Sequence, residues 1–326
     1  MAQLQTTCIA TGNTILDKAC ACLTTSGQLW FNTGTQRLEY TFFSPGGSAT
    51  WSATNQMITP RRLLGGAGSV NTTLANTGYR DGAGVVNCVE AFNGSTWSSR
   101  TGMINSGFYS STAGTQNAAL STGRYNGLGV RTCTELFNGS SWSTGGALNV
   151  ARFSVAMAGT PTAGLAFFGV TPSTVGCTER YNGTSWSNAT GGSGGRWRAW
   201  GAGTQNAAVI FGGTPSTNIE TYNGTSWTTG PNMITPRQLL GGAGNGSSVS
   251  TLAMGGYNTC SNAEIWNGST WATATAMISG RMMNAGSGGS NQSALAFGGY
   301  QGGSKFYPAP NLYSAPPPFG INVCVL

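Results

Sequence analysis

The sequence predicts an all-β domain built from six tandem repeats, and three observations lead to this prediction. Charged residues make up only 7% of the 326-residue chain, whereas 52 residues are Gly. A hexapeptide with the pattern aromatic-Asn-Gly, two Ser or Thr, and Trp recurs along the chain. Apolar runs that end in Gly precede its copies. Short apolar runs alternating with Gly, Asn and Ser are typical of many short strands joined by tight turns.

The length of the repeat is measured along its tryptophans, which are separated by 46, 45, 44, 41 and 44 residues. The tryptophans of the series are Trp51, Trp97, Trp142, Trp186, Trp227 and Trp271. Trp51 follows a diverged copy of the motif at residues 43–47, and we count it as a member. A regular period of this length indicates a repeat architecture.

Each repeat divides into four expected strands. In the repeat that contains residues 88–92, this segment is the third strand, and an Asn-Gly hairpin with positive φ at both turn residues connects it to the Trp strand. Apolar segments that end in Gly, such as residues 208–213, form the second strand. A Gly-rich first strand, such as residues 237–244, fits the crowded space around a central axis.

Taken together, these motifs resemble the kelch repeat over about residues 36–305. The Gly-Gly doublet is intact in three repeats and altered at Thr77-Gly78, Thr122-Gly123 and Phe168-Gly169. The resemblance implies a β-propeller of four-stranded blades. The last repeat, residues 281–300, lacks its third and fourth strands, and residues 38–51 supply such a pair. We therefore expect six blades, with N- and C-terminal strands paired in one blade. Seven blades are the alternative, if the two ends form separate sheets.

The expected domains are an N-terminal attachment arm (1–34), the propeller (35–305) and a Pro-rich C-terminal extension (306–326). Residues 27–40 resemble a short segment of bacteriophage tail and fibre proteins, which implies a virion component. The extension ends in the apolar residues 321–326. It either docks onto a neighbouring chain or folds back on its own propeller, and the sequence leaves both open.

Nearly all acidic residues occupy one position of the repeat, which indicates a structural role. These residues are Glu39, Glu90, Glu135, Glu179, Glu220 and Glu264. An Arg recurs seven residues before a Gly, at Arg61, Arg152, Arg196, Arg237 and Arg281. We expect each Arg to pair with a repeat Glu. The second repeat breaks the series, because Gly107 stands in the position of the Arg.

This inventory predicts no catalytic residues and no cofactor. The chain has no His, which excludes the His and Tyr ligand set of copper-oxidase propellers that resemble it. It also has too few clustered carboxylates for calcium. The eight Cys include Cys88, Cys133 and Cys177, each two residues before a repeat Glu, so on separate blades they are expected to be free thiols.

One segment departs from its siblings, with Trp197, Arg198 and Trp200 where the other repeats carry Leu, Phe or Met. Core packing is one interpretation, and a ligand-contact patch suited to stacking on a sugar ring is the other. The net charge of +7 lacks a dense basic run, so we expect no nucleic-acid partner. We also expect no membrane span and no secretory signal peptide.

The sequence therefore favours a structural component of a phage-like virion, located on the extracellular particle and present in many copies. Its terminal arms would bind other virion proteins, and its propeller would adsorb to a host-surface glycan or contact a neighbouring subunit. A lectin-like propeller of another origin is the alternative, and a glycan-cleaving enzyme is the weakest candidate.

Overall fold

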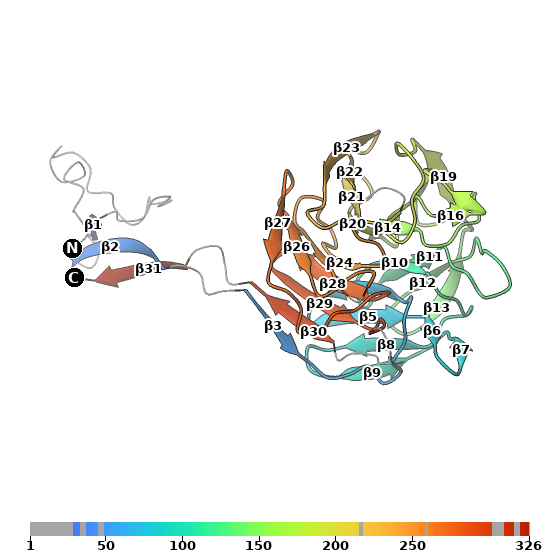
Figure 1. Ribbon diagram of the computed structural model, residues 1–326, viewed down its shortest axis with the longest axis horizontal. Helices are drawn as coiled ribbons and strands as arrows, with labels where there is room; N and C mark the ends of the chain where they lie inside the picture. Colours follow the sequence, from blue (N-terminus) through green and yellow to red (C-terminus); the bar gives the residue numbers. More distant parts are fainter. Residues whose placement is uncertain are drawn as a thin grey trace. The chain divides into compact units, whose positions relative to one another are not determined.

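The computed structural model describes residues 29–32, 37–44, 49–214, 218–258, 260–301, 310–315 and 320–325. In this part of the chain every regular element is a β-strand. It contains no helix of the length and apolar character that crossing a membrane requires. The chain divides into two compact units, Ala49–Ser314 and a smaller unit of the two chain ends. The larger unit is a six-bladed β-propeller, as predicted (Figure 1).

Each blade is a four-stranded antiparallel sheet. Blade 1 consists of β4 (Gly65–Ser69), β5 (Thr72–Asn76), β8 (Val89–Phe92) and β9 (Trp97–Arg100). Blade 2 consists of β10 (Ser111–Gly114), β11 (Ala119–Thr122), β12 (Thr134–Phe137) and β13 (Trp142–Gly145). Blade 3 consists of β14 (Ala156–Thr160), β15 (Ala163–Phe167), β18 (Thr178–Tyr181) and β19 (Trp186–Ala189).

The other three blades repeat this order with shorter or displaced segments. Blade 4 consists of β20 (Trp200–Gly203), β21 (Ala208–Phe211), β22 (Asn218–Tyr222) and β23 (Trp227–Asn232). Blade 5 consists of β24 (Gly241–Ala243), β25 (Thr251–Met254), β26 (Ala263–Trp266) and β27 (Trp271–Ala274). Blade 6 consists of β28 (Ala285–Ser290), β29 (Ser293–Phe297), β30 (Asn311–Ser314) and β3 (Thr50–Ala53).

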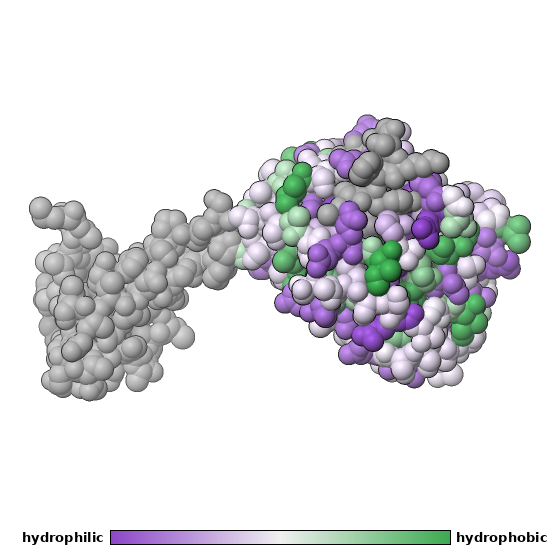
Figure 2. Space-filling model, turned by 90° about the horizontal axis from the view of Figure 1, so that it is seen from below, coloured by the Kyte–Doolittle hydropathy of each residue, from purple (hydrophilic) through white to green (hydrophobic). Residues whose placement is uncertain are grey.

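In blades 1 and 3 the connection between the second and third strands contains a short two-stranded hairpin. These hairpins are β6 (Tyr79–Arg80) with β7 (Gly84–Val85), and β16 (Val170–Thr171) with β17 (Ser173–Thr174). In Figure 1 the labelled first strands β10, β14, β20, β24 and β28 lie nearer the middle of the ring than the fourth strands of their blades. From the side seen in Figure 2, hydrophobic residues form separate patches among hydrophilic ones.

The hairpin between third and fourth strands forms at the predicted Asn-Gly pairs, but its turn differs from the prediction. Phe92 pairs with Trp97, so four residues form the loop, and only the Gly has positive φ (93° at Gly94). The Asn93 side chain accepts hydrogen bonds from the backbone N–H groups of Ser95 (2.9 Å) and Thr96 (2.8 Å). The Asn is therefore selected for its side-chain acceptor, which replaces part of the turn hydrogen bonding.

An aromatic pair at the end of this hairpin anchors each blade. The repeat Trp contacts the aromatic residue at the end of the third strand, as Phe92 and Trp97 do with ring centroids 5.1 Å apart. Trp186 also donates a hydrogen bond to Thr134 of the preceding blade (2.9 Å). The Trp series thus contributes both to the core of a blade and to the contact between blades.

The closing blade joins both ends of the propeller, as predicted, but its third strand was predicted wrongly. That strand is β30, in which Tyr313 pairs with Trp51 of β3. Asn311 stands opposite Ala296, the register position that Glu90 holds opposite Ala75. Glu39, assigned to this position from the sequence, instead lies in β2 (Arg37–Ser44), outside the propeller. The propeller accordingly spans 49–314 rather than the expected 35–305.

The smaller unit contains a three-stranded antiparallel sheet with the order β1 (Leu29–Asn32), β2 and β31 (Gly320–Val325). The expected arm of residues 1–34 is described only at Leu29–Asn32, and the rest lies outside the described residues. Of the expected extension, β30 belongs to blade 6 and β31 pairs with β2 of the same chain. The two chain ends therefore come together in one sheet.

Candidate functional site

Five blades contain a buried Arg–Glu ion pair. The pairs are Arg61–Glu90, Arg124–Glu135, Arg152–Glu179, Arg196–Glu220 and Arg237–Glu264. In blade 1, Arg61 Nε donates a hydrogen bond to the carbonyl of Thr77 (2.7 Å), the residue that directly follows the second strand. The Glu90 carboxylate also accepts the N–H groups of Ile58 (2.7 Å) and Thr59 (3.1 Å). The pair thus ties the incoming loop to the second and third strands.

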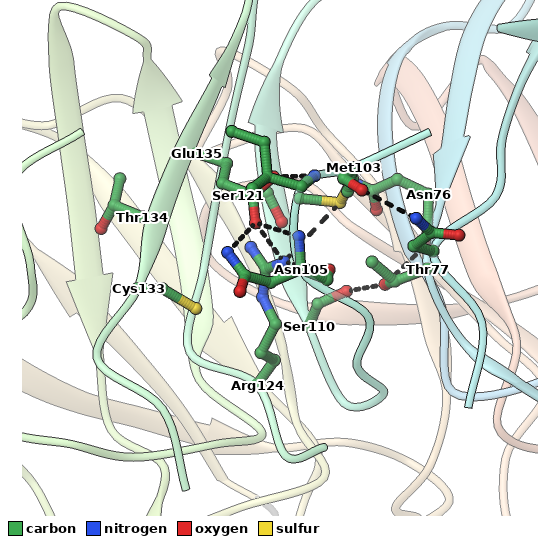
Figure 3. Close-up of polar contacts among 12 residues, drawn as sticks. Asn76, Thr77, Met103, Asn105, Ser110, Ser121, Arg124, Cys133, Thr134 and Glu135 are labelled. Atoms are coloured by element: carbon green, nitrogen blue, oxygen red, sulfur yellow. Dashed lines mark hydrogen bonds and ion pairs between the residues drawn. The ribbon is translucent and has the colours of Figure 1, made fainter. Parts of the chain in front are cut away.

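Blade 2 keeps the ion pair although Gly107 stands where the Arg was expected. Its guanidinium comes from Arg124, whose Nη1 lies 2.8 Å from Glu135 Oε1 and 2.9 Å from the carbonyl of Asn105 (Figure 3). Arg124 occupies the second position of the Gly doublet, where blades 1 and 3 have Gly78 and Gly169. Gly123 is therefore the first residue of this doublet, and the sequence alignment at Thr122-Gly123 was shifted by one residue.

The Arg and the Gly have exchanged positions in blade 2. In blade 1 a Cβ on Gly78 would lie 3.3 Å from Arg61 Cδ, so the doublet Gly makes room for the Arg side chain. In blade 2 a Cβ on Gly107 would lie 2.6 Å from Arg124 Cδ. The space is filled from the opposite side, and the salt bridge to the third strand is retained.

Blade 6 has a neutral amide in the position of the Glu. Asn311 is buried, and its Oδ1 accepts a hydrogen bond from the N–H of Ser279 (3.5 Å). Arg281 is fully buried and donates to the carbonyls of Ala296 and Gly298 (both 3.3 Å). Burial lowers the pKa of Arg281 to about 10. Because the pKa of Arg281 is lower in the folded than in the unfolded chain, the charged Arg281 lowers the free energy of unfolding at neutral pH. This penalty is relieved only when Arg281 loses its proton at strongly alkaline pH.

The substitution Asn311→Glu is expected to stabilise the propeller at pH 7 by about 1–3 kcal/mol, because it places a carboxylate opposite a buried guanidinium. Asn311→Gln has the same length without the charge and is the control. The gain should disappear as the pH falls through the pKa of the new carboxyl. Thermal unfolding of both variants at pH 7 and pH 3 measures this, and equal melting temperatures at pH 7 would contradict it.

Asp81, the remaining acidic residue of the described propeller, also has an Arg partner. Asp81 lies 3.0 Å from Arg62. Cys88, Cys133 and Cys177 are half-buried free thiols, and burial raises the pKa of each. Within the described ranges no three His, Cys, Asp or Glu side chains gather closely enough to hold a metal ion.

One end of the propeller carries a ring of residues with unusual backbone geometry. It is the end at which the first strands begin, and the connections between strands 2 and 3 and between successive blades lie there; we call it the mouth face. Six equivalent residues, one per blade, have φ between 53° and 60°. This mouth ring consists of Leu63, Tyr109, Ser154, Arg198, Leu239 and Met283.

Hydrogen bonds connect the mouth ring from blade to blade. The N–H of Tyr109 donates to the carbonyl of Leu63 (2.9 Å), and four further links of the same kind follow around the ring. At the remaining link, the N–H of Arg198 donates to Ser154 Oγ (2.8 Å). Positive φ is costly for residues other than Gly and concentrates at functional sites. Here the backbone repeats around the axis, whereas the six side chains are of five kinds, with Leu in blades 1 and 5.

A cavity of about 60 Å³ opens at the mouth ring, and all six ring residues line it. The next residue of each blade forms a second tier, which includes Ser110 and Asn284. Trp200 also lines this cavity and a smaller one of about 20 Å³ beyond it. Because equivalent positions in other blades are small, such as Gly65 and Gly241, the Trp200 indole fills space around the axis.

At the opposite end, Asn245 ties three blades together. Its N–H donates to the carbonyl of Gly288 in blade 6 (2.9 Å), and its Nδ2 donates to the carbonyl of Gly68 in blade 1 (2.7 Å). The two ends of the propeller are thus built differently, and the mouth face is the end with the varied side chains.

An arc of aromatic side chains surrounds the mouth over blades 1 to 4. This aromatic collar consists of Tyr79, Phe108, Tyr125, Phe153 and Trp197, each in contact with the next at centroid separations of 5.4–6.2 Å. All five are half-buried, so each retains exposed ring surface. The guanidinium of Arg198 lies 3.7 Å from the ring centroid of Trp197. The collar and the cavity together form the candidate ligand-binding site.

The three residues singled out in the sequence lie in this site with different positions. Trp197 belongs to the collar, Arg198 to the mouth ring, and Trp200 to the cavity wall. Trp200 also packs against two core clusters, so both sequence interpretations apply to it. Sequence reasoning missed Tyr109 and Asn284, because neither belongs to a recurring motif.

No protein-family model matches this chain, and no curated protein matches it.

Proposed function

We propose that this protein is a rigid, non-catalytic binding module of a phage-like particle, which presents the mouth face to a host-surface glycan. The observation that carries the proposal is the mouth ring, where six equivalent backbone positions hold six chemically varied side chains around a cavity. A closed scaffold that holds varied side chains in fixed geometry suits recognition.

The distribution of exposed apolar residues favours the same face. Seven large hydrophobic side chains of the described chain are more than half exposed. Six of them lie in connections at the mouth face, namely Ile58, Ile104, Leu128, Ile234, Tyr257 and Ile278. The mouth face therefore exposes more large apolar side chains than the opposite end, where Val249 is the seventh of them.

Binding is favoured over glycan cleavage by the placement of the acidic residues. Glycoside hydrolysis usually needs two carboxyl groups beside the scissile bond. In the described chain the five blade Glu residues and Asp81 all form ion pairs with Arg, and the mouth cavity is lined without any carboxylate.

The particle assignment is supported by the resemblance of residues 27–40 to phage tail and fibre segments. In that stretch β1 and β2 pair as antiparallel strands, the arrangement that the resemblance implies. We infer that the terminal sheet of β1, β2 and β31 attaches the protein to other particle proteins.

Attachment is tested by deleting residues 315–326, which removes β31 but leaves β30 and the propeller intact. The shortened chain should melt at the same temperature as the full chain and be absent from purified particles. Deletion of 306–326 is the control, because it also removes β30 and should lower the melting temperature. Incorporation of the 315–326 deletion at the wild-type level would contradict the attachment role.

A further inference from the structure

We propose that the mouth cavity binds the carboxylate of an acidic saccharide whose sugar ring lies against the aromatic collar. This inference rests on the proposed binding function and names the class of ligand. The charge of the cavity, its size and the adjoining aromatic arc support this inference.

Two side chains of the cavity wall have polar atoms without hydrogen-bond partners. Asn284 is only 5% exposed, and neither its Nδ2 nor its Oδ1 has a partner. Arg198 Nε is likewise buried and without a partner. These atoms are closed to solvent, and the Asn284 amide lies against Gly241 and Gly255 in the contact between blades 5 and 6, so neither side chain presents them to the cavity.

The charge of the cavity favours an anion. Arg198 is its one charged lining residue among those described, and no carboxylate accompanies it. The guanidinium is held in place by stacking on Trp197 and by donation to Gln238 Oε1 (3.2 Å). A pre-positioned guanidinium in a partly buried site forms strong, directional hydrogen bonds with a carboxylate.

The size of the cavity fits a carboxylate better than a whole sugar. A volume of about 60 Å³ corresponds to roughly four or five water positions. The rest of the ligand must therefore lie outside, over the collar. Binding sites typically combine aromatic surface with a few placed polar groups, and the apolar face of a sugar ring packs well on half-exposed aromatic rings such as Tyr125 and Phe153.

The experiment uses the full chain and a set of immobilised oligosaccharides that end in N-acetylneuraminate, glucuronate or galacturonate. Each is paired with its carboxyl-reduced counterpart, and sulfated oligosaccharides and oligothymidylate complete the set. We expect binding to at least one carboxylated saccharide and at least tenfold weaker binding to its reduced form.

Two variants assign the binding to the cavity. Arg198→Met should weaken binding about tenfold or more, because it removes the charged donor. Arg100→Met is the matched control, since Arg100 is an exposed residue at the end of β9 and loses the same charge outside the cavity. Its affinity should stay within about threefold of wild type.

Several results would overturn the inference. They are no binding of any carboxylated saccharide, equal binding of the reduced forms, preference for the sulfated sugars or the oligothymidylate, and equal losses in Arg198→Met and Arg100→Met. Melting temperatures near wild type show that each variant is folded. The proposed attachment to a particle is measured separately by incorporation, so either idea can fail while the other stands.

Discussion

Arg124→Gly is expected to destabilise the propeller by about 3–5 kcal/mol, and a second substitution, Gly107→Arg, is expected to restore the lost stability. The single change leaves the buried Glu135 carboxylate without its guanidinium, and breaking a buried pair from one side carries a cost of this size. Gly107→Arg alone should also destabilise, because a Cβ at this position would lie 2.6 Å from Arg124 Cδ.

The double variant recreates the arrangement of the other blades. The new Arg at position 107 would reach Glu135 from the first-strand side, as Arg61 reaches Glu90. It would also gain carbonyl partners for its Nε, which Arg124 lacks in blade 2. Chemical denaturation of the four proteins gives the coupling energy. If the losses of unfolding free energy in the two single variants simply add in the double variant, positions 107 and 124 are not energetically coupled and the account is wrong.

Trp51→Ala is expected to cost about 3–5 kcal/mol and to open the closing blade. Trp51 contacts Tyr313 at a centroid separation of 4.9 Å. Trp51 lies in the N-terminal strand of the propeller and Tyr313 lies in its C-terminal strand. The indole N–H of Trp51 also donates to the carbonyl of Thr275 in blade 5 (2.7 Å). Loss of this side chain therefore removes a contact within blade 6 and a bond to its neighbour.

Trp142→Ala is the control, because it removes the same side chain from a blade whose four strands are continuous in the chain. Both variants should melt at lower temperature than wild type. Only Trp51→Ala should accelerate amide hydrogen exchange in β3 and β30, where opening separates the chain ends. Equal exchange of these strands in both variants would contradict the view that blade 6 is the clasp of the ring.

Periodicity predicted the ring because every blade needs the same elements. The Trp hairpins, the Gly-rich first strands and the ion-pair positions recur at fixed spacing, and the structure assembles them into six blades. The third strand of blade 6 escaped prediction for a physical reason. The chain leaves blade 6 after Ser314, and the fourth strand of that blade, β3, comes from the N-terminal side of the propeller, so no Asn-Gly hairpin joins the two strands.

The residues of the site were harder to find, since a search for repeats ignores positions that vary. Arg124 was missed because a salt bridge depends on where two side chains meet, and the Arg can approach from either of two strands. In five blades the mouth-ring residue stands two residues after the repeat Arg, as Leu63 follows Arg61, and in blade 2 Tyr109 stands two residues after Gly107. The residues at this offset and at the offsets on either side of it vary between repeats, and that variable stretch after a regular Arg is the signal that could have revealed the ring.

The central claim is that the scaffold uses the described carboxylates for structure and leaves the mouth face for recognition. Hydrogen–deuterium exchange of the full chain, with and without a carboxylated saccharide, tests it most directly. We predict slower exchange in peptides that contain residues 62–64, 108–111, 196–200 and 282–284. Protection confined to the Asn-Gly hairpins at the opposite end, or unchanged exchange with saccharide bound, would contradict the claim.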